Sequence, residues 1–368
     1  KNAKKESGFV NDKGCYKFEF FRLSARRFGV MNDYHFGDTN RKSQEAVVDK
    51  LINLQKRPEF IVMPGDLLDC PTAPAGDGNP LHFPAVRDIW GNLIDGLEEQ
   101  SIPVADGLGN HDLWTGFGGE NVKGDIQQRN KKRIAEGSLF LPYGISTADN
   151  AANYGNKGYH YTWFFPLKKN GKKVLVAFFM LNNLPGNANR TDPGDTGHGH
   201  DEGTYAFGAL DYLKASMRTM ACMPDYDYKV GIPMFHINYG CDVNGDTHGN
   251  PERWWTYADK KALKDVLDKA PIKIVTAFFG HEHVRSIEKQ TLYIGDRKDP
   301  ANKTEYSGYR CACSIDKPRL NIIDLELVEE NGHCKIKITP RFIEVAKLTS
   351  TDDCLPMIKE ELQSCIEL

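Results

Sequence analysis

Five short segments of the chain carry carboxylate, imidazole and amide side chains in spacings that suit metal binding. Ions such as Zn, Mn and Fe accept these ligand types, and no cysteine falls among them. Asp66 has two carboxylate oxygens and can bridge two ions about 3.5–4 Å apart, which is the spacing of two-metal hydrolases. The segments are Asp33-Tyr34-His35, Gly65-Asp66-Leu67-Leu68-Asp69, Gly109-Asn110-His111-Asp112, the isolated His236 and Gly280-His281-Glu282-His283.

The elements that must position these residues are the apolar runs directly before them. Ligands of open α/β sheets bind beyond the ends of strands, so five strand ends can converge on one site. Residues two apart on a strand share a face, which applies to Asp33 with His35 and to His281 with His283. Glycines at 65, 109 and 280 allow sharp turns beside the ligands. The runs that predict buried strands are residues 28–31, 60–63, 102–104, 230–235 and 272–279.

These motifs (D-x-H, G-D-x-x-D, G-N-H-D, a lone His and G-H-x-H) resemble those of the calcineurin-like metallophosphoesterase superfamily, from Phe28 to Arg285. The resemblance implies two divalent or trivalent ions as cofactors, either Mn, Fe or Zn. It implies that one ion is held by Asp33, His35, Asp66 and His283, and the other by Asp66, Asn110, His236 and His281.

The resemblance also implies the reaction. A dinuclear metal-bridging water or hydroxide attacks the phosphorus of a phosphate ester, and His111 helps the leaving oxygen to depart. An imidazole suits that role because it titrates near neutral pH. By similarity to the protein phosphatase branch, Asp69 pairs with His111 and keeps it charged. The alternative is that Asp69 caps the helix that follows it.

Departures from the better-known branches narrow the function. Cys70-Pro71 stands where protein phosphatases have Arg-Gly, and Asp69 stands where purple acid phosphatases have a metal-binding Tyr. Only about 85 residues follow His283, too few for the C-terminal domain of 5′-nucleotidases. We therefore expect a metal-dependent hydrolase of phosphate esters. The alternatives are a phosphodiesterase specialised for nucleotide or lipid head groups, and a secreted binding protein or effector without turnover.

The loops between the ligand segments must define the substrate. A Trp or Tyr there can stack on a base or ring, and a histidine can contact the substrate or a third ion. The competing interpretations are core packing for the tryptophans and a solvated loop for the histidines. The candidates are Trp114, His198, His200, Tyr239 and Trp254.

Composition indicates an ordinary soluble enzyme. The chain has 368 residues, of which 40% are hydrophobic and 26% charged, with a formal net charge of −3. That charge argues against a dedicated nucleic-acid surface. No apolar run approaches the ~18 residues of a transmembrane segment. The sequence does not indicate the oligomeric state.

Three features favour a secreted or lumenal protein over a cytoplasmic one. The chain begins at Lys1, it carries nine cysteines, and Asn189 and Asn302 open N-glycosylation sequons. We expect disulfides, and Cys222 and Cys241 can close a loop. Nine is an odd number, so at least one thiol stays unpaired within the chain. The alternative is that several cysteines are merely buried apolar residues.

The order of predicted elements defines the fold class. Alternating helices and strands followed by strand-rich sequence predict an α/β fold with two packed mixed β-sheets, and the resemblance implies a four-layer α/β/β/α sandwich. We expect a catalytic domain over residues 1–345 and a helical extension over 346–368. Helices are predicted at residues 43–55, 83–100, 209–220 and 257–270, a hairpin at 159–181, and further strands at 17–23, 279–287, 292–294, 321–326 and 335–343.

Overall fold

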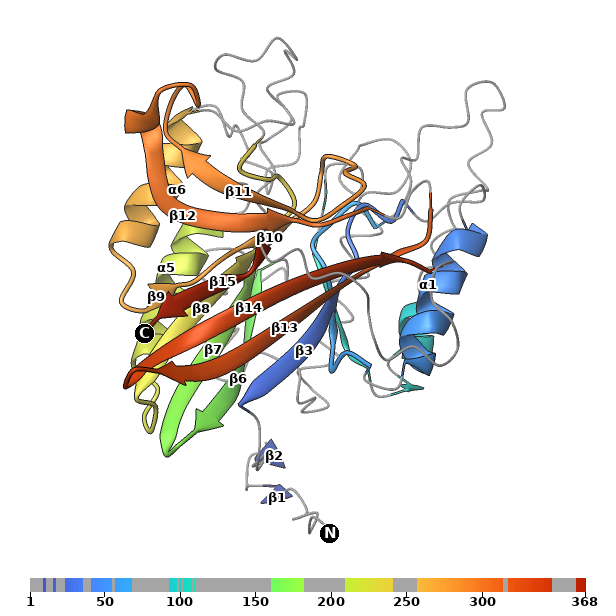
Figure 1. The fold of residues 1–368 in the computed structure, drawn as a ribbon, viewed down its shortest axis with the longest axis horizontal. Helices are drawn as coiled ribbons and strands as arrows, with labels where there is room; N and C mark the ends of the chain where they lie inside the picture. Colours follow the sequence, from blue (N-terminus) through green and yellow to red (C-terminus); the bar gives the residue numbers. More distant parts are fainter. Residues whose placement is uncertain are drawn as a thin grey trace.

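Two mixed β-sheets pack face to face, and helices cover their outer sides (Figure 1). The predicted α/β class with two packed mixed sheets is thereby confirmed. The computed structural model describes residues 9–10, 16–17, 24–35, 41–54, 57–67, 93–97, 99–100, 102–107, 109, 160–181, 209–240, 257–313, 317–345 and 362–368.

The first sheet has six strands in the described part of the chain, in the order β15-β14-β13-β3-β4-β5. Three of its strands are parallel and follow one another along the sequence: β3 (Ala25–Val30), β4 (Ile61–Met63) and β5 (Val104–Asp106). The other three are antiparallel: β13 (Arg319–Glu330), β14 (His333–Glu344) and β15 (Ser364–Glu367).

The second sheet has the order β11-β12-β10-β8-β7-β6, with β9 paired to β8. Its centre is parallel and its two edges are antiparallel. The strands are β6 (Tyr161–Lys169), β7 (Lys172–Met180), β8 (Tyr228–Met234), β9 (Lys273–Ile274), β10 (Phe278–Phe279), β11 (Glu288–Tyr293) and β12 (Lys303–Arg310). A 3₁₀ turn, η3 (Pro300–Asn302), precedes β12, and β1 (Phe9–Val10) pairs separately with β2 (Tyr16–Lys17).

Strand β7 shows how the layers form. Val174, Val176 and Phe178 belong to the core between the two sheets, whereas Leu175 and Phe179 belong to the cluster that includes the helices. This alternation follows from the two-residue period of a strand. All of these side chains are buried, and burial of each stabilises the fold by about 1.5–3 kcal/mol.

Helix α1 (Arg41–Asn53) lies on the opposite side of the sheets from α5 (Ala209–Ala221) and α6 (Tyr257–Asp268) (Figure 1). Val47 and Leu51 of α1 are buried in the same cluster as Met63. Helices therefore flank the two sheets on both sides, which is the expected four-layer arrangement.

Two tight turns join long antiparallel strands. Asn170-Gly171 connects β6 to β7, and Asn331-Gly332 connects β13 to β14. All four residues have positive φ, between 48° and 80°. Asn-Gly is the preferred pair for such turns because both positions need a left-handed backbone. The hairpin predicted at residues 159–181 is confirmed.

Two element predictions were wrong. The chain leaves the second sheet after β10, so the strand expected over residues 279–287 is a loop from Gly280 until β11 begins at Glu288. At the C-terminus, Ser364–Glu367 forms strand β15, not helix, because its backbone bonds to the edge of β14. Tyr309 also donates to the carbonyl of Leu362, at 2.7 Å. The last residues thus share the first sheet with β3, β4 and β5, while residues 346–361 of the predicted extension lie outside the described ones.

Four of the described cysteines fit the alternative of apolar and free residues better than that of disulfides. Cys222 and Cys365 are exposed free thiols, and Cys311 and Cys334 are buried ones. The expected disulfides are therefore not formed at these four positions, and no bridge from Cys222 closes the loop to Cys241.

In the sequon at Asn302, the side-chain amide donates to the carbonyl of Asp296, which gives that asparagine a role in the turn. None of the described helices is both long and apolar enough to cross a bilayer.

Candidate metal centre

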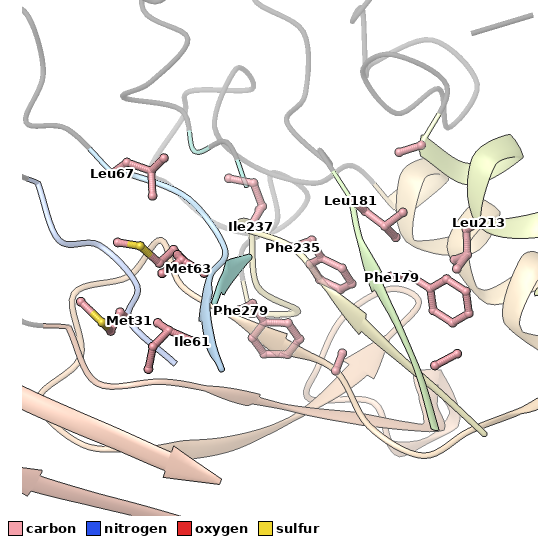
Figure 2. Close-up of a cluster of buried hydrophobic side chains, with 14 of the residues drawn as sticks. Met31, Ile61, Met63, Leu67, Phe179, Leu181, Leu213, Phe235, Ile237 and Phe279 are labelled. Atoms are coloured by element: carbon pink, nitrogen blue, oxygen red, sulfur yellow. The ribbon is translucent and has the colours of Figure 1, made fainter. Parts of the chain in front are cut away.

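The proposed ligands follow strands of both sheets. Asp33 and His35 come after β3 and Asp66 after β4 of the first sheet, while His236 comes after β8 and His281 and His283 after β10 of the second. Residues beside them are buried in one hydrophobic cluster, where Leu67, Phe235, Ile237 and Phe279 are at most 1% exposed (Figure 2). These neighbours anchor the strand ends and leave the ligand side chains to face each other.

The first group of ligand atoms comes from Asp33, His35, Asp66 and His283. One ligand atom from each residue lies within 4.8 Å of the others. The Nε2 atoms of His35 and His283 are 2.9 Å apart, and His35 Nε2 lies 3.6 Å from Asp66 Oδ2. Asp33, His35 and Asp66 are buried, whereas His283 is exposed.

The second group consists of Asp66, His236 and His281, again with ligand atoms within 4.8 Å of one another. His236 Nε2 lies 3.2 Å from Asp66 Oδ2 and 3.3 Å from His281 Nδ1. Asp66 belongs to both groups, which is the position that a bridging carboxylate requires.

The backbone is strained at these residues. Asp33, His35, Asp66 and His281 all have positive φ, at 49°, 45°, 51° and 75°. Such values are uncommon for residues with a Cβ, and they concentrate at functional sites where surrounding contacts hold them. The expectation that Asp33 and His35 share the face of a strand was therefore wrong, because β3 ends at Val30.

Hydrogen bonds between the loops hold this geometry. His35 N donates to the carbonyl of Asp66 at 3.0 Å, and Gly280 N donates to the carbonyl of His236 at 3.1 Å. Asn238 reinforces the second contact because its Nδ2 donates to the carbonyl of Gly280, also at 3.0 Å. Backbone hydrogen bonds thus join the loop after β3 to the loop after β4, and the loop after β8 to the loop after β10.

Two glycines are needed because the backbone approaches a ligand closely. A Cβ at Gly109 would lie 2.1 Å from both the backbone N and Oδ1 of Asp66. A Cβ at Gly280 would lie 2.6 Å from Asp33 Oδ2. Both distances are far below a normal contact, so a side chain at either position would displace a carboxylate.

The carboxylate of Asp33 lies in an unfavourable environment for a negative charge. Burial raises the pKa of Asp33 above its ordinary value, and the neighbouring Asp66 raises it further. His236, His283 and the amide of Asn32 act in the opposite direction. Two buried carboxylates surrounded by imidazoles form a donor set that a divalent cation would complement, so this buried His/Asp cluster could bind metal ions.

An ion pair lies beside the histidine loop. Arg310, which ends β12, pairs with both Glu282 and Glu288. Glu282 stands between His281 and His283, so the pair ties the loop to the neighbouring strand. Nothing in the local sequence indicates this partner, which lies 28 residues away.

Several predicted site residues lie outside the described ones: Asp69, Asn110, His111, Trp114, His198, His200 and Trp254. Tyr239 is described and packs in the hydrophobic core, and its predicted contact with substrate stays a prediction. It is 1% exposed, with its ring 4.7 Å from that of Phe279, and burial raises the pKa of its hydroxyl.

Comparisons with known proteins add no closer assignment. No family model matches the chain, and no curated protein matches its sequence. Among solved structures, GAP50, the anchor in the inner membrane complex of Plasmodium, has a TM-score of 0.48 and 17% identity over 92% of this chain and 90% of its own. The structure of PhoD has a TM-score of 0.46 and 10% identity, over 86% of this chain and 65% of PhoD. The NAD nucleotidase of Haemophilus influenzae has a TM-score of 0.36 and 9% identity, over 87% of this chain and 50% of its own. These scores are all below 0.5, so the similarities assign no function to this chain.

Proposed function

We propose that the protein is a metal-dependent hydrolase of phosphate esters that holds two metal ions. The observation that carries this proposal is the sharing of Asp66 by two groups of converging ligands. We assign Asp33, His35, Asp66 and His283 to one ion. Asp66, His236 and His281 belong to the other, with Asn110 as the fourth ligand implied by the motifs.

When bound, two such ions lower the pKa of water and draw charge from phosphoryl oxygens, which supports hydrolysis near neutral pH. The chain's own residues hold the ligand geometry. Asp33, His35, Asp66 and His236 are at most 1% exposed, whereas His283 is exposed to solvent. We assign the leaving-group proton to His111 and the support of its charge to Asp69, on the strength of their motifs.

Metal content and turnover test the proposal together. The protein is stripped with a chelator, reconstituted with Mn, Zn or Fe, and assayed on p-nitrophenyl phosphate and bis-p-nitrophenyl phosphate. We expect two equivalents of metal and a turnover that depends on them, and the ratio of the two rates distinguishes monoester from diester preference. Asp66→Asn should lose both metal equivalents and activity. Full activity in the stripped protein, or with a single equivalent, would overturn the two-metal assignment.

A further inference from the structure

Asn32 is a buried asparagine between β3 and the ligand Asp33, and it is 0% exposed. Its Nδ2 donates to Asp33 Oδ2 at 2.5 Å and to the carbonyl of Cys311 at 3.1 Å. Both partners are oxygen acceptors, so the opposite orientation of the amide would place oxygen against oxygen. The contacts therefore fix which side of the amide faces Asp33.

The carbonyl of Cys311 is itself held rigidly. Cys311 follows β12, and its backbone N donates to the carbonyl of Phe279 at 3.1 Å. The next residue, Ala312, is held by Asn321 of β13, whose Oδ1 accepts from Ala312 N at 2.9 Å and whose Nδ2 donates to Ala312 O at 2.7 Å. The same Nδ2 donates to the carbonyl of Val30 at 3.0 Å. Cys311 thus offers Asn32 an acceptor that is fixed to both sheets.

Asp33 receives one hydrogen bond on each carboxylate oxygen. Asn32 Nδ2 donates to Oδ2, and the backbone N of His281 donates to Oδ1 at 2.8 Å. Two donors on different oxygens fix the rotation of the carboxylate plane. One donor comes from the loop after β3 and the other from the loop after β10, so the orientation of Asp33 depends on the register between the two sheets.

We propose that Asn32 is a positioning residue of the metal centre, which orients the carboxylate of Asp33 by tying it to the carbonyl of Cys311 in the opposite sheet. The inference rests on the metal site of the proposed function but not on its hydrolytic activity. Partners of this kind change metal affinity by 10–100-fold when they are removed.

Asn32→Leu and Asn32→Ser test this role. The leucine keeps the approximate size of the side chain without a donor or a charge, and the serine keeps a donor of shorter reach. The matched control is Thr162→Val, which removes a buried hydrogen bond to Tyr212 in another part of the molecule. Affinity is measured by titrating Zn²⁺ against a chromophoric chelator, and folding is measured by circular dichroism.

We expect both Asn32 variants to fold and to bind one equivalent of Zn²⁺ 10–100-fold more weakly than the parent protein, with a smaller change in the second equivalent. Thr162→Val should keep both affinities. Unchanged Zn²⁺ affinity in folded Asn32 variants would overturn the inference, as would failure of both variants to fold, because the role would then be structural. A parent protein that binds two equivalents of Zn²⁺ but hydrolyses no ester would overturn the proposed function and leave this test in place.

Discussion

At the scale of the residue, the proposed chemistry separates the groups that hold ions from the group that carries a proton. His111→Ala should keep the metal content and lower the rate by about 10²–10⁴-fold, the usual weight of general acid catalysis. The loss should be smaller for p-nitrophenyl phosphate than for an alkyl phosphate, because a good leaving group needs little protonation. Steady-state rates on the two substrates, with metal analysis of the same preparations, provide the measurement. Equal losses on both substrates would show that His111 acts in another way.

The convergence of the described candidate ligands could be predicted from sequence, because each of them comes shortly after an apolar run that forms a strand. Asn32 could not be predicted in this way. Its partner Cys311 is 279 residues away and offers a main-chain carbonyl, which leaves no mark on the sequence. The ion pair of Arg310 with Glu282 could not be predicted for a similar reason, because only the pairing of β12 with β10 brings Arg310 beside the loop that carries the histidines.

At the scale of the element, the loop after β5 must pass the loop after β4 without a side chain between them. Gly109→Ala would place a Cβ 2.1 Å from Asp66 Oδ1, so we expect a stability loss of about 1–3 kcal/mol together with weaker metal binding. Gly96→Ala is the control, because Gly96 lies in a helical segment and its Cβ would meet no atom within 4 Å. That variant should gain about 0.5–1 kcal/mol and keep its metal. Urea unfolding measures the stability of both variants, and Zn²⁺ titration measures their metal affinity. Similar changes of stability and affinity in the two variants would contradict a close approach of the backbone at Gly109.

Helices and long strands were predictable where an apolar pattern had a clear period, as in β7 and α5. The two wrong elements have different causes. Residues 280–287 follow an apolar run, but the chain leaves the sheet at Gly280 and brings two histidines to the candidate metal centre. The C-terminal segment became a strand because β14 offered an open edge, which is a tertiary contact and not a local preference.

At the scale of the whole molecule, buried tyrosines set the alkaline limit of stability. Burial raises the pKa of Tyr212 and of Tyr309 to about 12 each, above the ordinary value of about 10. These two hydroxyls therefore ionise first in the unfolded chain, so their contribution to stability is constant below pH 10 and is lost as the pH rises from 10 to 12. Tyr212→Phe should be less stable at pH 8 by about 1 kcal/mol, because it loses the hydrogen bond with Thr162, but its decline above pH 10 should be shallower. Urea unfolding at pH 8, 10 and 11 gives the two curves, and parallel curves would contradict the role of Tyr212.

The metal centre should also couple the two sheets, because its ligands come from both of them. An ion that binds only the folded protein stabilises it by about 2.7 kcal/mol when its free concentration is 100 times Kd. Burial raises the pKa of Asp33, and the neighbouring carboxylate of Asp66, which is also buried, raises it further, so the two carboxylates repel each other without metal. Asp66→Asn should therefore have opposite effects on the stripped and on the metal-loaded protein. It should raise the Tm of the stripped protein and abolish the increase that Mn or Zn causes in the parent. Calorimetry of both proteins, stripped and reconstituted, measures the four values of Tm. A lower Tm in the stripped variant combined with a preserved response to metal would show that Asp66 supports the fold and not the ions.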